Sequence, residues 1–135
     1  MKMPKVEEAL YDTRFFVEHF FSNNKETLAR TRTEIESPSR EKITSVITLH
    51  EFYRLNLEKQ GRAVAMLRTN MIKDQFRPVD VSLEIAIQAA ELRKKYSIPM
   101  GDSLIAATAK VLLCICITDD PHFRAIKEIK SRWIF

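Results

Sequence analysis

The spacing of apolar residues alternates between two patterns along the chain, and each change of pattern marks an expected element. Apolar residues three or four positions apart, such as Phe16, Val17 and Phe20, predict a helix. Short runs rich in β-branched or apolar residues, such as "KITSVI" (42–47), predict strands. Helices are expected over 13–21, 25–37, 48 to about 61, 62–76, 82–95 and 101–113, and strands over 7–12, 42–47, 77–81, 113–118 and 131–135.

This alternation of strands with helices predicts the architecture. The run "LCICIT" (113–118) is apolar at nearly every position, as in a strand that is covered on both faces. We therefore expect a three-layer α/β/α fold with a central, mostly parallel sheet. The sequence shows no linker or internal repeat, so residues 1–135 are expected to form a single domain.

Composition narrows the class of protein. The 135 residues are 45% apolar and 30% charged, which is typical of a soluble, ordered globule. The chain has no apolar run near the ~20 residues that cross a bilayer, and "MKMPKVEE" lacks the apolar core of a signal peptide. We therefore expect no membrane association and a cytoplasmic location. The net charge of +4 is compatible with a phosphate-rich partner, although the scattered basic residues equally fit a solvated surface.

The cysteines and histidines give no sign of a metal site of their own. Cys114 and Cys116 point the same way along one expected strand, which suits core packing and not a bond between them. His19, His50 and His122 have no H-x-x-x-H spacing, so we expect surface or packing roles.

Four carboxylates fall at one edge of the expected sheet. Asp12 closes the first strand, Glu51 lies in the first turn after the second strand, Asp102 opens a helix, and Asp120 follows "LCICIT". Each alone has a structural explanation: Glu51 can complete a capping box with Thr48, and the three aspartates can cap helices or fix a turn.

Together these acids suggest more than capping. Four carboxylates at one sheet edge repel one another unless a cation neutralises them. Ligands gather beyond the carboxyl ends of parallel strands, which is where the four acids are expected to lie. Oxygen ligands without histidine or cysteine favour Mg²⁺ or Mn²⁺.

Four sequence motifs carry a family resemblance. In order and spacing, "LYDTRFFV", "SVITLHEF", "GDSLIAATA" and "ITDDPHF" resemble the acidic motifs of PIN-domain proteins, most closely the VapC-type toxin ribonucleases of toxin–antitoxin pairs. The resemblance places the four catalytic, metal-ligating acids on Asp12, Glu51, Asp102 and Asp120, with Thr118 beside the last. The first strand, "KVEEALYD", is more acidic than is usual in the family.

The resemblance implies an activity and partners. It implies Mg²⁺- or Mn²⁺-dependent cleavage of RNA, a homodimer, and inhibition by a small cognate antitoxin. The chemistry is consistent, because a metal at such a cluster activates water and offsets charge on a phosphodiester. Glu51 would bind the ion or orient the attacking water, and Arg14 is a candidate RNA phosphate contact. A dimer is expected to use the Phe-rich helix 13–21 and the helix 62–76.

Two alternatives remain open on the sequence alone. The chain could be a catalytically silent PIN-like module that binds RNA or protein, although such a module could lose any of the acids. It could also be a phosphoacceptor signalling domain, which would need a lysine just after a late strand; here "KEIK" (127–130) precedes the last one.

The adjacent acids of "TDDP" are expected to diverge. Side chains alternate along an extended segment, so Thr118 and Asp120 should face one way and Asp119 the other. Pro121 disfavours the helical region for Asp120 and so preserves the alternation. Asp119 is then expected to be a supporting acid behind the ligands, or the cap of the short helix that follows.

Overall fold

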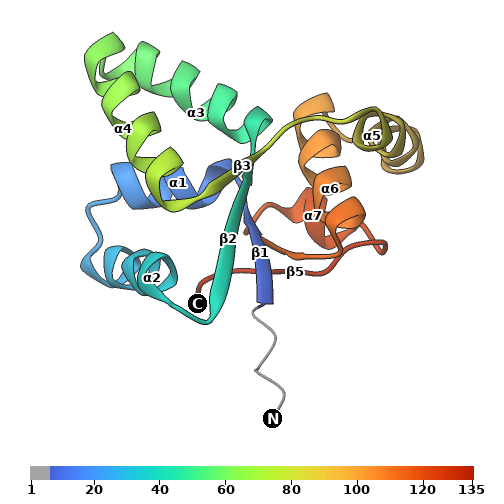
Figure 1. The fold of residues 1–135 in the computed structure, drawn as a ribbon, viewed down its shortest axis with the longest axis horizontal. Coiled ribbons are helices and arrows are strands. Elements are labelled where there is room, and N and C mark those ends of the chain that lie inside the picture. The colour runs from blue at the N-terminus through green and yellow to red at the C-terminus, as the bar shows by residue number, and fades with distance from the viewer. Residues whose placement is uncertain (1–6) are drawn as a thin grey trace.

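Parallel strands form the centre of the molecule. The computed structural model describes residues 7–135 (Figure 1). Its strands are β1 (Glu7–Tyr11), β2 (Arg40–Ser45), β3 (Arg77–Val79), β4 (Ile115–Ile117) and β5 (Ser131–Arg132). They form one sheet in the order β3-β2-β1-β4-β5, and every neighbouring pair is parallel.

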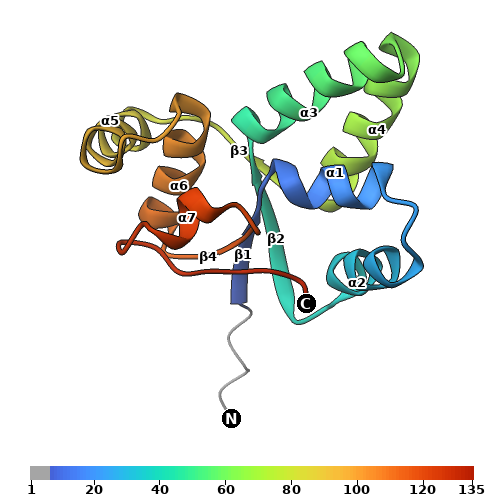
Figure 2. The same ribbon diagram turned by 180° about the vertical axis from the view of Figure 1, so that it is seen from behind.

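Helices cover both faces of this sheet. They are α1 (Thr13–Phe21), α2 (Lys25–Glu36), α3 (Val46–Lys59), α4 (Arg62–Gln75), α5 (Leu83–Tyr96), α6 (Met100–Leu112) and α7 (Pro121–Arg124). The helices α1 to α4 lie on one side and α5 to α7 on the other, in the front view and from behind (Figures 1 and 2). The predicted three-layer α/β/α fold with a parallel sheet is confirmed.

Alternating residues of β1 feed two separate cores, as the period of two in a strand requires. Leu10 packs in an aliphatic core with Ile85 and Leu92 of α5 and the alanines of α6. Ala9 and Tyr11 face a second core, which holds Phe15 and Phe16 of α1. Both of these phenylalanines are fully buried, so α1 is anchored to the sheet directly behind Asp12.

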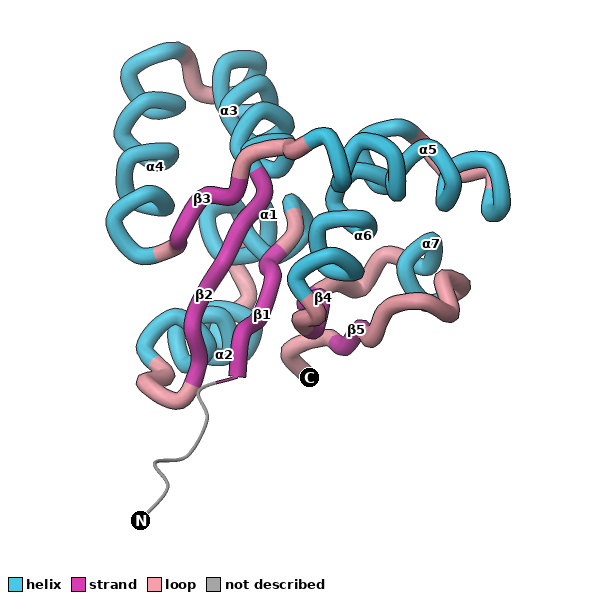
Figure 3. The backbone as a smooth tube through the Cα atoms, turned by 45° about the vertical axis from the view of Figure 1, so that its right-hand side comes forward, coloured by secondary structure: helices cyan, strands magenta, loops and turns pink. Residues whose placement is uncertain are grey.

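The order of the strands creates a crossing point beside β1. The chain moves outward from β1 to β2 and β3, then returns through α5 and α6 to place β4 on the other side of β1 (Figure 3). Ligands of open parallel sheets bind where the order reverses in this way. Tyr11 pairs with Ile117, so Asp12 and Thr118, the next residue of each strand, emerge side by side.

Several elements begin or end at other residues than expected. The helix α3 begins at Val46 and not at Thr48, because the Ser45 side chain caps it by accepting from the Ile47 amide at 3.0 Å. The strand β4 is shorter than "LCICIT", because α6 continues to Leu112 and Leu113 ends it in a left-handed conformation (φ 54°). The expected last strand is reduced to Ser131–Arg132.

Two expectations from composition can be compared with the structure. Cys114 and Cys116 are free and buried, which confirms them as core residues. Within residues 7–135, none of the helices has the length and apolar character needed to span a bilayer. The expectation for the leading "MKMPKVEE" lies mainly outside the described residues.

Candidate active site

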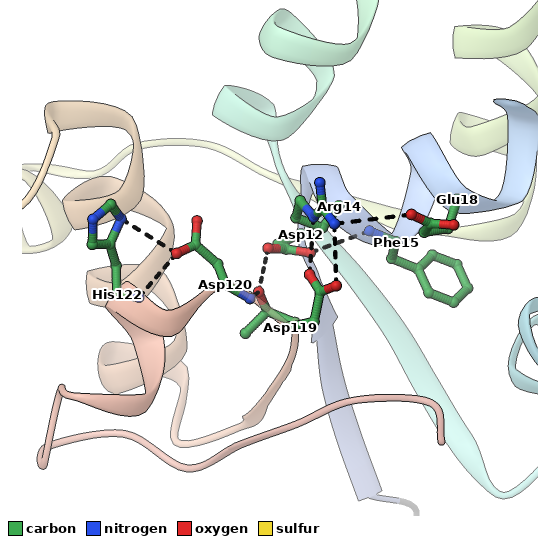
Figure 4. A network of polar contacts seen from close by, with 8 residues as sticks. Asp12, Arg14, Phe15, Glu18, Asp119, Asp120 and His122 are labelled. Carbon is green, nitrogen blue, oxygen red and sulfur yellow. Dashed lines mark hydrogen bonds and ion pairs between the residues drawn. The ribbon is translucent and has the colours of Figure 1, made fainter. Parts of the chain in front are cut away.

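Asp12 is a buried carboxylate at the carboxyl end of β1. It caps α1 by accepting from the Phe15 amide at 3.3 Å, and its second oxygen accepts the Thr118 hydroxyl at 2.6 Å (Figure 4). Only 3% of Asp12 is exposed. Burial raises its pKa to about 7; the two hydrogen bonds act against this, and the charges of Asp119 and Asp120 add to it. Because burial destabilises the ionised form of Asp12, a cation beside it would be bound favourably.

The turn after β4 sends its two aspartates in different directions. The Asp120 amide donates to the Thr118 hydroxyl at 3.0 Å, which fixes the turn. Asp119 meets Arg14 of α1, whereas Asp120 meets His122 (Figure 4). The two side chains therefore diverge as the alternation predicts. The cap of the short helix α7 is Asp120, which accepts the His122 amide at 2.9 Å, and not Asp119.

Asp102 reaches the same place from the other side of the site. It lies in the first turn of α6, which begins at Met100, so Asp102 is not the cap of this helix. Burial raises the pKa of Asp102; hydrogen bonding to His122 lowers it, and the charge of Asp120 raises it further. One atom each of Asp102, Asp120 and His122 lies within 4.8 Å of the others.

His122 is the residue that sequence reasoning missed. Its Nδ1 lies 2.8 Å from Asp102 Oδ2 and 3.3 Å from Asp120 Oδ1. The expectation that no histidine is in reach of the acids is therefore wrong. The signal was local: a residue two positions after Asp120, across a proline that starts a helical turn, folds back onto the acid that caps the turn. His50 is exposed, and His19 contacts Thr31, as expected for surface and packing roles.

Glu51 lies between the starts of α1 and α6. The expected capping box with Thr48 is absent, because α3 starts two residues earlier and Ser45 caps it. Glu51 Oε1 instead accepts the Thr13 hydroxyl at 2.6 Å. On its other side, a Cβ added to Gly101 would meet Glu51 Oε2 at 2.9 Å. Since Thr13 follows Asp12 and Gly101 precedes Asp102, Glu51 lies at the same edge as the other acids.

Arg14 places a cation beside this acidic edge. Its Nε and Nη2 bind the two oxygens of Asp119 at 2.9 and 3.2 Å, and Glu18 lies 3.9 Å away. The Arg14 side chain remains half exposed. Its planar group therefore already binds one oxyanion and is open to solvent, as a phosphate contact requires.

The donor set fits a divalent ion. Asp102 and Asp120 present carboxylate oxygens around one point, and Asp12 joins them through Thr118. The raised pKa values of Asp12 and Asp102 are the electrostatic cost that an ion between them would remove. Several carboxylates around one point are typical of Mg²⁺ and Mn²⁺ sites.

Comparisons with known proteins identify the fold. Similar solved structures include VapBC2 from Rickettsia felis bound to a promoter DNA fragment (TM-score 0.78, 15% identity, covering 93% of this chain and 98% of that one). A toxin–antitoxin complex from Klebsiella pneumoniae has a TM-score of 0.71 at 25% identity, with 94% and 98% covered. Mycobacterium tuberculosis VapC20, a sarcin–ricin loop cleaving toxin, has a TM-score of 0.71 at 17% identity, with 87% and 93% covered.

The search of curated proteins finds no significant match. The model of the PIN domain family, in contrast, matches residues 9–129, a span that contains all four acids of the site. This chain therefore belongs to the PIN-domain family, as its four acidic motifs predict.

Proposed function

We propose that this protein is an endoribonuclease that cleaves RNA phosphodiester bonds with Mg²⁺ or Mn²⁺, and that it acts as the toxin of a toxin–antitoxin pair. The observation that carries the proposal is the grouping of Asp102 and Asp120 within 4.8 Å at this edge of the sheet, to which the almost fully buried Asp12 is linked through Thr118. PIN-domain membership supports nuclease activity in general.

Asp12, Asp102 and Asp120 would hold the metal, directly or through water. A bound divalent ion supplies a water of lowered pKa and offsets the charge that builds up on a phosphodiester during in-line displacement. Thr118 keeps Asp12 oriented through its hydroxyl. Asp119 would act as a supporting acid, because its carboxylate is engaged by Arg14.

Glu51 would orient the attacking water or complete the ligand set. Its carboxylate accepts the Thr13 hydroxyl, and the absence of a side chain at Gly101 leaves room for its second oxygen. Arg14 would exchange Asp119 for a phosphate oxygen of the RNA. A groove lies beside Glu51 and would bind the adjoining part of the RNA strand. Its lining includes His50, Arg54 and Met100. Such backbone contacts supply affinity without sequence preference.

The partner would be a small antitoxin, and the protein would act in the cytoplasm as a homodimer. The similar structure from Klebsiella pneumoniae is a toxin–antitoxin complex, and this chain covers 98% of the matched chain in it. The test is the neighbouring reading frame: co-expression of a small protein encoded there should relieve growth arrest and co-purify with this chain. An unrelated neighbour that neither binds nor relieves toxicity would contradict the toxin role.

RNA cleavage by antitoxin-free protein tests the activity. Wild-type protein should cleave structured or single-stranded RNA with Mn²⁺ and stop in EDTA. Asp102→Asn should lose at least about 100-fold in rate while it keeps the fold, because it removes a charge and little volume. Asp74→Asn on the exposed surface of α4 is the matched control and should cleave at the wild-type rate. Full activity of Asp102→Asn, or binding of RNA without cleavage by the wild type, would contradict the proposal.

A further inference from the structure

His122 lies close enough to the acids to be a ligand itself. Its Nδ1 is 2.8 Å from Asp102 Oδ2 and 3.3 Å from Asp120 Oδ1. In an octahedral site with bonds of about 2.1 Å, neighbouring ligand atoms are separated by about 3.0 Å. The two distances lie on either side of this value. Nδ1 and one oxygen each of Asp102 and Asp120 therefore lie close enough together to share one ion.

The backbone holds the imidazole in this place. His122 is the second residue of α7, and its amide donates to the Asp120 carboxylate that caps the helix. Phe123, the next residue, is 1% exposed and anchors the turn in the core. The side chain of His122 is about half exposed. Figure 4 shows it beside Asp120. In the absence of an ion, Nδ1–H donates to Asp102; ligation would require this proton to be carried on Nε2, which frees the Nδ1 lone pair for the ion.

A nitrogen ligand changes which ion the site prefers. Mg²⁺ favours oxygen donors and keeps its waters, whereas imidazole nitrogen suits the transition metals. Mn²⁺ accepts both oxygen and nitrogen donors. A site of carboxylates alone would discriminate less between the two ions than a site with an imidazole in the set.

We propose that His122 coordinates the catalytic ion through Nδ1, together with Asp102 and Asp120, and thereby makes the site select Mn²⁺ over Mg²⁺. The proposal rests on the proposed function, since it adds a ligand to the same metal site. The proposal gives His122, which is not one of the four acids, a role as a metal ligand. The imidazole donates a lone pair to the ion, and no covalent bond of the protein forms or breaks.

The test measures metal binding without RNA. Binding of Mn²⁺ is followed by electron paramagnetic resonance, and Mg²⁺ is measured by competition, on wild type, His122→Ala, Asp102→Asn and the control Asp74→Asn. In His122→Ala, the Mn²⁺ dissociation constant should rise about tenfold and that of Mg²⁺ by about twofold or less. Asp74 is exposed on α4, outside the site, so Asp74→Asn should bind both ions as the wild type does. Bound Mn²⁺ should also show ¹⁴N coupling from one imidazole, which His122→Ala abolishes.

The outcomes distinguish a failure of the His122 proposal from a failure of the proposed nuclease function. Mn²⁺ that binds the wild type without ¹⁴N coupling, and is lost in Asp102→Asn, would overturn ligation by His122 and leave the nuclease site standing. Tighter Mn²⁺ binding by His122→Ala would also overturn it, because the imidazole would then compete with the ion. Failure of the wild type to bind Mn²⁺ or Mg²⁺ would overturn the proposed function as well. The α7 cap uses the backbone amide and not the ring, so His122→Ala should fold.

Discussion

Asp12 combines two uses of one carboxylate. Its first oxygen caps α1 through the Phe15 amide, which is an ordinary structural role. Its second oxygen is held by Thr118 and faces the cluster of acids after β4. Asp120 differs, because its Oδ1 both accepts the His122 amide that caps α7 and lies 3.3 Å from His122 Nδ1. The cap therefore leaves its second oxygen, Oδ2, available for the proposed ion.

The contact between Gly101 and Glu51 gives a prediction for a single residue. A methyl group at Gly101 would come within 2.9 Å of Glu51 Oε2, the mobile end of a side chain, so Glu51 must move while the fold need not. Gly101→Ala should therefore lower RNA cleavage by about tenfold or more. Its stability should stay within about 1 kcal/mol of wild type, because alanine is the better helix former. Cleavage rate and thermal unfolding of the same sample check this.

Gly61→Ala is the matched control for this substitution. Among the described residues no atom lies within 4 Å of the position of its added Cβ, but Gly61 has φ 87°, which alanine rarely adopts. Gly61→Ala should therefore lose about 1–2 kcal/mol of stability and keep its cleavage rate below the unfolding transition. The opposite result, with Gly101→Ala fully active and Gly61→Ala inactive, would contradict the proposed role of Glu51 in RNA cleavage.

Sequence reasoning reached the acids but not their surroundings. The positions of Asp12, Glu51, Asp102 and Asp120 follow from strand ends and helix starts, which apolar patterns locate to within a few residues. The contacts of Thr13 and Gly101 with Glu51 depend on how α1, α3 and α6 approach one another, and no local pattern encodes this. His122 was missed for a different reason: its position two residues after Asp120, across Pro121, is a local signal, but it does not form a known metal-binding spacing with another histidine.

At the scale of elements, Glu34 joins parts of the chain that are far apart in sequence. From α2 it accepts the Tyr11 hydroxyl of β1 at 2.9 Å, and Arg40 of β2 at 2.5 Å. Arg132 of β5 lies 3.1 Å from its other oxygen. Burial acts to raise the pKa of Glu34, but these hydrogen bonds and the two arginine charges outweigh it and hold the pKa below its usual value. This network fastens α2 and the last strand to the sheet.

Glu34→Gln should destabilise the protein by about 1–3 kcal/mol at pH 7, because a charged acceptor is lost and two arginines lose their partner. A lowered pKa in the folded state means that this stability is present above the ordinary pKa of 4.5 and is lost as pH falls through the folded value. The difference between wild type and variant should therefore shrink below about pH 4.5. Urea unfolding at several pH values measures it.

Glu26→Gln serves as the control for the same helix. Glu26 is largely exposed and forms a loose ion pair with Arg30 one turn away at 3.8 Å, so its loss should change stability by less than about 0.5 kcal/mol. A pH-independent difference for Glu34→Gln, or an equal effect of both variants, would show that the network is no stronger than a surface pair.

The apolar patterns predict which helices and strands form more accurately than they predict the first and last residue of each. Every expected helix and strand exists, because the apolar period reports which side of an element is buried. The ends moved where capping competed: Ser45 starts α3 two residues early, and Leu113, expected to be the last helical residue, ends α6 in a left-handed conformation. Such choices depend on one side-chain hydrogen bond or one backbone angle, which the apolar period does not contain.

At the scale of the whole molecule, apolar surface remains on α4. Met66, Leu67 and Met71 are 42%, 61% and 46% exposed. Phe15 and Phe16 of α1, in contrast, are fully buried, so the expectation that these two residues offer a surface for dimerisation is wrong. If the protein is a homodimer, α4 is the part of the expected interface that the fold leaves open.

Light scattering at micromolar concentration should therefore give about twice the chain mass of 15.8 kDa. Leu67→Glu should shift the wild-type dimer towards the monomer, because it places a charge in the centre of an apolar contact. Leu83→Glu on α5, at a residue 78% exposed on the opposite side of the sheet, should leave the dimer intact. A wild type that remains a monomer would contradict the assembly.

The central claim, that the buried Asp12 and the acids beside it form a cation site, is tested most directly by thermal unfolding of wild type and Asp12→Asn at pH 8 with and without Mn²⁺. In EDTA, Asp12→Asn should unfold about 3 °C or more above wild type, because it removes a buried charge and keeps an oxygen for the Phe15 amide. With Mn²⁺ near 100 times its dissociation constant, wild type should gain about 2.7 kcal/mol and overtake the variant. Asp119→Asn should keep most of the Mn²⁺ gain. Equal stabilisation of wild type and Asp12→Asn by Mn²⁺ would contradict the account.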